Sequence, residues 1–258
     1  MDTLAALIND LTNLTRSFCD GGSARSVFIS DIPGQLRIAH NAERLHPPAS
    51  LAKVLIAETA VHIGLDFTAS IPVTKLHATA YPSILNAFDA DRELSLRELM
   101  SLSLTTSDNA SADYVLDLVG IDRVNKRAQE LGMTHTHIAT GFRDDEFNRG
   151  DESTTCANDM ARLLEEIYSK REVDGHRRIW RALTNNLRNT RIPGLLPDEL
   201  VVAHKTGSLN GLAHDAGVLL LPNTHLVLVV LTEHEPVPLR TSLEIASYAR
   251  AIYDCITN

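Results

Sequence analysis

The stretch from residue 199 to residue 235, "ELVVAHKTGSLNGLAHDAGVLLLPNTHLVLVVLTEHE", decides the fold. Its pieces "ELVVAHKTGS", "LAHDAGVLLLP" and "HLVLVVLTEHE" are rich in Val and Leu and are separated by turn residues, which is typical of three adjacent antiparallel strands. Near the start of the chain, "ARSVFISD" and "GQLRIAHN" have the same character and are joined by a turn at Pro33 and Gly34. The sequence therefore predicts one antiparallel sheet of about five strands.

Helical patterns occupy both ends and the middle of the chain. "MDTLAALINDLTNLTRSF" and "TSLEIASYARAIYDCI" are the expected terminal helices, and the region from about Ser50 to Leu187 is helical in pattern. Its clear helices are "SLRELMSLSLTT", "NASADYVLDLVG", "IDRVNKRAQELG" and "CANDMARLLEEIYSK". We expect an α/β (α+β) fold in which the terminal helices flank the sheet. Residues 1–48 plus 190–258 would form a discontinuous α/β domain and residues 49–189 an inserted all-α domain, with the active site in the cleft between them.

Composition narrows the class of function. The chain of 258 residues has 24 Lys and Arg against 33 Asp and Glu, a formal net charge of −9. Nucleic acids and anionic membranes bind basic surfaces, so neither is an expected partner. A small soluble substrate and a monomeric protein are the better expectation. No apolar run approaches the roughly 20 residues that a membrane-spanning helix needs.

Other features bear on compartment and cofactors. The first residues lack the basic start and uninterrupted apolar run of a signal peptide, so the chain is either cytosolic or a mature form with an added Met. Cys19, Cys156 and Cys255 are odd in number and scattered, which argues against a disulfide framework. No metal or other cofactor is expected, because no H-E-x-x-H spacing occurs and "TEHEP" reads as a strand end.

Three short motifs carry the chemistry. In "HPPASLAKVLIAETAVH", which begins at His46, Ser50 and Lys53 share one helix face and bring a hydroxyl beside an amine. Alone, Ser-x-x-Lys is as consistent with an ordinary surface pair, because chance supplies about one in a chain of this length. "SDN" at residues 107–109 lies between helices, and "KTG" at residues 205–207 lies on the first strand of the C-terminal trio. The joint occurrence in this order favours an active site.

With these motifs the chain resembles the serine β-lactamase and penicillin-binding protein superfamily, and is most similar to class A β-lactamases. The resemblance covers nearly the whole chain. It implies that Ser50 is the acylated nucleophile, Lys53 its base, and Ser107 the group that protonates the leaving nitrogen. It also implies an oxyanion hole formed by the backbone N–H groups of Ser50 and Ser208. The remaining expected substrate-binding residues are Asn109, Lys205, Thr206, Gly207 and Ser208.

The sequence departs from class A enzymes where they carry the Glu that activates the deacylating water, in an E-x-x-x-N segment. In "RDDEFNRGDESTT", matching Asn148 to that Asn puts Asp144 at the Glu position. Its carboxylate would sit about 1.5 Å back, and mispositioning on that scale can cost about 100-fold in rate. Glu146 is the alternative base, and a solvated acidic turn is the alternative to both. Rapid deacylation is therefore in doubt.

The sequence says less about which residues bind the parts of the substrate on either side of the bond that is broken. The family usually places an Arg near K-T-G, and here Arg240 and Arg191 are candidates, with surface charges as the alternative. Tyr81 is expected either as an aromatic wall of the cleft or as core. His204 alternates to the strand face opposite Lys205 and is expected to be a packing residue.

The leading interpretation is a hydrolase of the class A β-lactamase type. The first alternative keeps the acylation machinery but deacylates slowly, as a penicillin-binding D,D-peptidase-like enzyme or an esterase or amidase on a non-lactam acyl substrate. The absence of a recognisable signal peptide favours this alternative somewhat. The second alternative is an inert sensor domain that forms a stable acyl adduct on Ser50.

Overall fold

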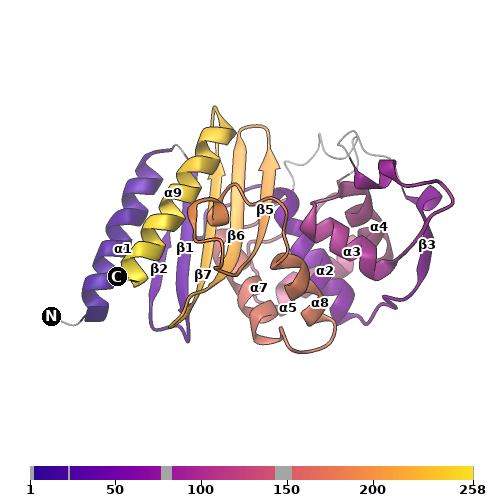
Figure 1. The fold of residues 1–258 in the computed structure, drawn as a ribbon, viewed down its shortest axis with the longest axis horizontal. Helices are drawn as coiled ribbons and strands as arrows, with labels where there is room; N and C mark the ends of the chain where they lie inside the picture. Colours follow the sequence, from indigo (N-terminus) through magenta and orange to yellow (C-terminus); the bar gives the residue numbers. More distant parts are fainter. Residues whose placement is uncertain (1–2, 23, 77–82, 143–152, 258) are drawn as a thin grey trace.

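A five-stranded antiparallel sheet forms the centre of the molecule (Figure 1). The computed structural model describes residues 3–22, 24–76, 83–142 and 153–257. The strands are β1 (Ala24–Ile32), β2 (Arg37–His40), β5 (Val202–Leu209), β6 (Leu212–Leu220) and β7 (His225–Glu233), in the order β2-β1-β7-β6-β5. All five predicted strands are confirmed. Because β1 pairs with β7, the sheet joins the two ends of the chain.

The two faces of the sheet are covered differently. The terminal helices α1 (Thr3–Asp20) and α9 (Pro238–Thr257) lie side by side on one face (Figure 1). Successive strand residues point to opposite faces, and β7 follows this rule. Leu226, Leu228 and Val230 pack in the cluster that includes the terminal helices, whereas Val227, Val229 and Leu231 pack in the cluster of the helical region. The sheet is therefore buried on both sides.

The helical region contains all four helices predicted for it and some unpredicted elements. Its helices are α2 (Ala52–His62), α3 (Leu96–Thr105), α4 (Asn109–Val119), α5 (Ile121–Glu130), α7 (Ala157–Ser169) and α8 (His176–Leu183). A short two-stranded sheet joins β3 (Ser70–Pro72) to β4 (Glu93–Ser95), so the description of this region as all-α was wrong in detail. Strands of three residues are too short to leave an alternating pattern in the sequence. The predicted division into two domains stays a prediction.

Helix α2 runs through the middle of this region. Every residue from Ala52 to Ala60 is buried, including Lys53 and Glu58. A helix that is apolar on all sides belongs inside a protein, and this one removes both charged side chains from water. The position of α2 thus sets the electrostatics of the residues that follow Ser50.

No helix in the described part of the chain has both the length and the apolar character needed to cross a membrane. The three cysteines are all described and all free; Cys19 and Cys156 are buried and Cys255 is exposed.

Candidate active site

Ser50 lies in a tight turn that leads into α2. A single 3-10 turn, Ala49–Leu51, precedes the helix, and the Ser50 side chain is half-buried. Ala49 has φ of 48°, in the left-handed region that a non-glycine residue occupies only when its surroundings hold it there. The backbone N–H of Ser50 is in a first helical turn, where a helix offers it no acceptor. The turn therefore presents both a hydroxyl and an unused donor.

Lys53 joins the first two motifs. Its Nζ donates to Ser50 Oγ at 3.2 Å, to the Ser107 carbonyl at 2.8 Å and to Asn109 Oδ1 at 2.6 Å. The Phe142 ring centroid lies 4.5 Å from the same nitrogen. The amine of Lys53 is thus held within reach of the Ser50 hydroxyl by groups on other elements.

Lys205, of the K-T-G motif, also contacts Ser107. Lys205 Nζ donates to Ser107 Oγ at 2.9 Å and to the Thr206 carbonyl at 2.8 Å, and Lys53 Nζ is 3.4 Å from Ser107 Oγ. The Ser107 hydroxyl therefore lies between two buried amines. Ser50, Lys53, Ser107 and Lys205 therefore lie together at one site, and their catalytic roles stay predictions.

Burial lowers the pKa of both amines. It lowers the pKa of Lys53 to about 7, against the opposing pull of the Asp108 and Asp113 carboxylates. Burial and the neighbouring Lys53 together hold the pKa of Lys205 well below its usual range. Two amines that share one hydroxyl disfavour each other's charge. Lys53 can therefore serve as a base near neutral pH.

The loop before α4 leaves the Ser107 hydroxyl free of a capping role, so that it can bond the two lysines. The helix is capped by Asp108, whose Oδ1 accepts from the Ser111 N–H at 2.7 Å, so the Ser107 hydroxyl is not used as the cap. Ser107 itself has φ of 65°. Asn109 begins the helix and turns its Oδ1 to Lys53, which leaves its amide hydrogens for a ligand.

Strand β5 passes close to the turn Ala49–Leu51, which carries Ser50. A Cβ on Gly207 would come within 3.2 Å of the Pro48 carbonyl and 3.3 Å of the Ala49 Cβ, so any other residue here would push these neighbours back by a few tenths of an ångström. Thr206 is buried and Ser208 is exposed. Substrate can therefore meet Ser208 at the rim of the site.

Arg191 places a positive charge beside Gly207 and Ser208 of β5. Its guanidinium donates to Ser208 Oγ at 2.6 Å, to the Gly207 carbonyl at 2.7 Å and to the His214 carbonyl. Its Nε donates to Ser242 Oγ at 3.1 Å, and the residue is 7% exposed. Of the two arginines proposed from the sequence, Arg191 is the one bonded to the K-T-G strand. Arg240 instead pairs with Glu244 at 3.0 Å, and its side chain is 81% exposed.

Two buried histidines lie on this part of the sheet, His204 on β5 and His214 on the neighbouring β6. His204 bonds Asp215 through Nδ1 at 2.9 Å and Asn189 through Nε2 at 3.0 Å, which fits the structural role predicted for it. His214 donates from Nε2 to the Pro47 carbonyl at 2.9 Å, a link to the nucleophile turn that the sequence did not reveal. Only the pairing of β6 with β5, which sets His214 opposite Gly207, could have indicated it.

Three predicted site residues, Tyr81, Asp144 and Glu146, lie outside the described residues. Their roles stay predictions.

Comparison with known proteins gives a consistent picture. The model of the "Beta-lactamase enzyme family" matches residues 6–256. A curated beta-lactamase of Bacteroides uniformis is 28% identical over 224 residues, which cover 75% of this chain and 71% of the relative. The D-alanyl-D-alanine carboxypeptidase DacB2 of Mycobacterium tuberculosis is 27% identical over 125 residues, 46% of this chain and 42% of the relative. A solved beta-lactamase structure from Chitinophaga pinensis superposes with a TM-score of 0.86 at 22% identity, covering 96% of this chain and 100% of that one.

Proposed function

Because the chain belongs to the beta-lactamase enzyme family, we propose that it is a serine hydrolase that opens β-lactam amides through an acyl-enzyme on Ser50. The observation that carries the proposal is the continuous chain of contacts from Ser50 through Lys53 and Ser107 to Lys205. A nucleophile beside a base, with the base oriented by further groups, is the arrangement that covalent catalysis needs.

In the acylation step, the neutral amine of Lys53 takes the proton from Ser50 Oγ while that oxygen bonds to the lactam carbonyl carbon. The carbon–nitrogen bond then breaks, and the Ser107 hydroxyl gives its proton to the departing nitrogen. Ser107 regains a proton from the Lys53 ammonium, which lies 3.4 Å away. The net result is transfer of the Ser50 proton to the lactam nitrogen, with both lysines returned to their starting state.

The charge that develops on the carbonyl oxygen needs donors. The backbone N–H groups of Ser50 and Ser208 are the proposed oxyanion hole, and removing such a donor typically costs a factor of about 10² to 10³ in kcat. On the other side of the lactam, Arg191, Thr206 and Ser208 are proposed to bind the substrate carboxylate. The buried guanidinium supplies positive charge near the carboxylate. It bonds the Ser208 hydroxyl, and that hydroxyl, on an exposed residue, would contact the substrate directly.

Release of the acyl group is proposed to use a water molecule activated by Asp144 or Glu146.

The substrate is a small molecule, and the active enzyme is proposed to be a monomer. Sedimentation at assay concentrations tests the oligomeric state.

A second candidate function keeps acylation but not rapid release. Two observations favour it: the relative named as a D-alanyl-D-alanine carboxypeptidase, and the Asp in place of Glu at the position matched to the deacylating base. The chain would then be a penicillin-binding D,D-peptidase-like enzyme, or an esterase or amidase.

The intact mass of the protein, followed with time after mixing with a penicillin and a cephalosporin, separates these functions. An adduct that forms and clears supports a β-lactamase, whereas a persistent adduct supports the second candidate. Ser50→Ala is the control, because a first-turn helix position tolerates Ala and the variant should fold without forming any adduct. Adduct formation by that variant, or no adduct on the parent protein, would count against acylation at Ser50.

A further inference from the structure

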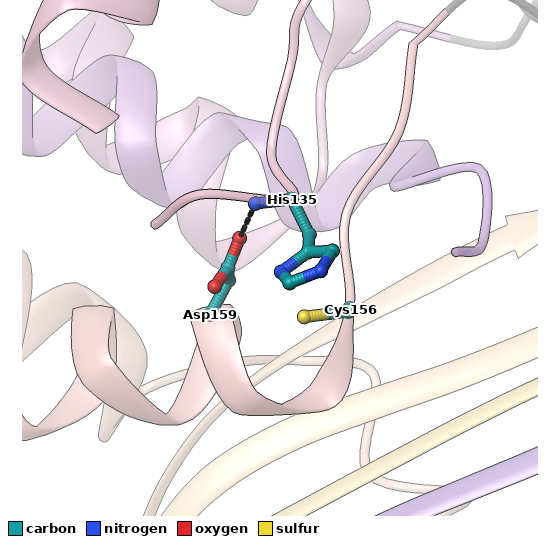
Figure 2. Close-up of side chains that lie close together, drawn as sticks. All are labelled: His135, Cys156 and Asp159. Carbon is teal, nitrogen blue, oxygen red and sulfur yellow. Dashed lines mark hydrogen bonds between the residues drawn. The ribbon is translucent and has the colours of Figure 1, made fainter. Parts of the chain in front are cut away.

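Outside the active site, three chemically different ligand groups meet at the N-terminal end of α7. The imidazole of His135, the thiol of Cys156 and the carboxylate of Asp159 are turned toward one another (Figure 2). One ligand atom from each lies within 4.8 Å of the other two. His135 comes from the loop after α5, Cys156 immediately precedes α7, and Asp159 is in its first turn. The cluster therefore ties a loop to a helix.

The cluster is held in place by hydrogen bonds around it. Asp159 Oδ2 accepts from the His135 backbone N–H and from Thr136 Oγ1, both at 2.8 Å, and the carboxylate also has a hydrogen bond with the Cys156 thiol, whose proton a bound metal would replace. Thr136 Oγ1 also meets Thr155 Oγ1 at 2.9 Å. Backbone bonds between His137 and Thr154, at 2.8 and 2.9 Å, join the two segments. The geometry is thus set by the fold before any ligand arrives.

A Cys–His nucleophile would be another use of these residues, but the structure opposes it. Asp159 bonds the backbone of His135 and not its imidazole, so the carboxylate does not orient a base. Cys156 is 0% exposed, and burial raises the pKa of its thiol to about 12. A reactive cysteine needs an accessible thiolate. The cluster therefore does not fit nucleophilic chemistry.

We propose that His135, Cys156 and Asp159 bind a divalent transition-metal ion of the zinc class. Imidazole nitrogen, thiolate sulfur and carboxylate oxygen are the ligands that zinc takes in proteins, and three protein ligands leave a fourth position for water. At ordinary zinc bond lengths the ligand atoms are roughly 3.6 Å apart, so small side-chain rotations close the site. The metal displaces the thiol proton as it binds. His135 is half-buried whereas the other two residues are buried, so we expect the metal to enter on the His135 side.

The other group of metal-type ligands in the described part of the chain, Glu58, Glu166 and His176, has a different explanation. The Arg127 guanidinium binds both carboxylates, at 2.7 Å and 3.1 Å. That cluster already has a cation paired with it, whereas no Lys or Arg among the described residues is bonded to Asp159.

Titration of the untagged full-length protein with Co²⁺ tests the proposal. We expect one Co²⁺ per chain and a near-ultraviolet charge-transfer band from thiolate to cobalt, with Zn²⁺ displacing the Co²⁺. Cys156→Ser should remove the band, and His135→Ala should weaken Co²⁺ binding at least tenfold. The matched controls are Cys255→Ser, at an exposed cysteine, and His137→Ala, at an exposed histidine of the same loop; both should bind Co²⁺ like the parent.

A parent protein that develops no band at excess Co²⁺, or a band that persists in Cys156→Ser, would overturn the proposal. His135→Ala changes a half-buried loop position, so it keeps the test decisive if the buried cysteine variant fails to fold. Acylation of Ser50 is not part of this readout, so the result is independent of the proposed function.

Discussion

Nε2 of His214 donates a hydrogen bond to the carbonyl oxygen of Pro47 at 2.9 Å, and so ties strand β6 to the turn that carries Ser50. The backbone N–H of Thr232 donates to His214 Nδ1 at 3.0 Å, which assigns the proton to Nε2. Burial, reinforced by the nearby His46, holds the pKa of His214 well below its usual range, so the ring is neutral. We therefore predict that His214 positions the turn that carries Ser50.

His214→Ala should slow acylation of Ser50 by about 10-fold to 100-fold, because the turn loses an anchor and small misplacements of a reacting group are costly. The rate of adduct formation with a penicillin, measured by rapid-quench mass spectrometry, checks this. Val218→Ala is the matched control: it removes packing from the same buried strand without touching Pro47, and should acylate at the parent rate. Equal acylation rates in the two folded variants would refute the positioning role.

The rate of acylation should rise with pH and level off above neutrality. The pKa of Lys53 is lowered to about 7 by burial, so the free amine that acts as base is scarce at pH 5 and dominant at pH 8. The measurement is kcat/KM, or the acylation rate, from pH 5 to 8.5, with an expected apparent pKa near 7. Lys53→Arg should lose at least about 100-fold, since a guanidinium stays protonated throughout this range. A flat profile would exclude Lys53 as the base.

Arg191→Gln should raise KM for carboxylated β-lactams by about 10-fold to 100-fold, since hydrogen bonds between charged groups are worth about 1.5–3 kcal/mol. Arg240→Gln should change KM less than about twofold, because that side chain is exposed and paired with Glu244. Steady-state kinetics of both variants test the choice between the two arginines.

Arg191 also bonds two backbone carbonyls, so a structural effect must be separated from a binding effect. With a penicillin methyl ester as substrate, the parent and Arg191→Gln should have similar KM values. An undiminished difference on the ester would mean that Arg191 only supports the strand.

Asp144→Asn and Glu146→Gln should affect deacylation differently. The variant that accumulates acyl-enzyme on intact mass analysis identifies the base that activates water. If neither accumulates it, another group performs hydrolysis.

Glu58→Gln should lower the free energy of unfolding at pH 7 by about 3–5 kcal/mol, because it removes the one fully buried carboxylate that pairs with Arg127 and leaves the more exposed Glu166 and Glu130. Burial alone would raise the pKa of Glu58, but the His176 ring 3.5 Å away and the hydrogen bonds from Arg127 outweigh it and lower the pKa from 4.5 to about 2. Its contribution is therefore full above pH 4.5 and is lost as pH falls through 2. Urea unfolding at pH 7 and pH 3 should give a smaller difference at the lower pH.

Glu130→Gln is the control for this measurement. Its carboxylate also contacts Arg127, at 3.4 Å, but is 39% exposed, so its loss should cost no more than about 1 kcal/mol. Equal effects of the two variants would contradict the assignment of the stabilising contact to Glu58.

Local patterns in the sequence were sufficient to predict the sheet, the long helices and the four motif residues that the structure brings together. Strand β7 could be predicted because a run of Val and Leu between turn residues has few alternatives. Ser50, Lys53, Ser107 and Lys205 could be predicted because each belongs to a short motif whose residues are adjacent on one element. Strands β3 and β4 were not predicted, because each is too short to show an alternating pattern in the sequence.

Tertiary structure alone decided the relationships between residues that no motif joins. Both Arg240 and Arg191 were candidates in the sequence, and only the packing of the chain puts Arg191 against Ser208. His214 reaches Pro47 across 167 residues of chain, and His135 reaches Asp159 across 24. The physical reason is that hydrogen bonds and ligand sites require atoms within about 3 Å. Periodicity specifies which face a residue occupies on its own element, but which residue of another element lies opposite is determined by pairing register and core packing.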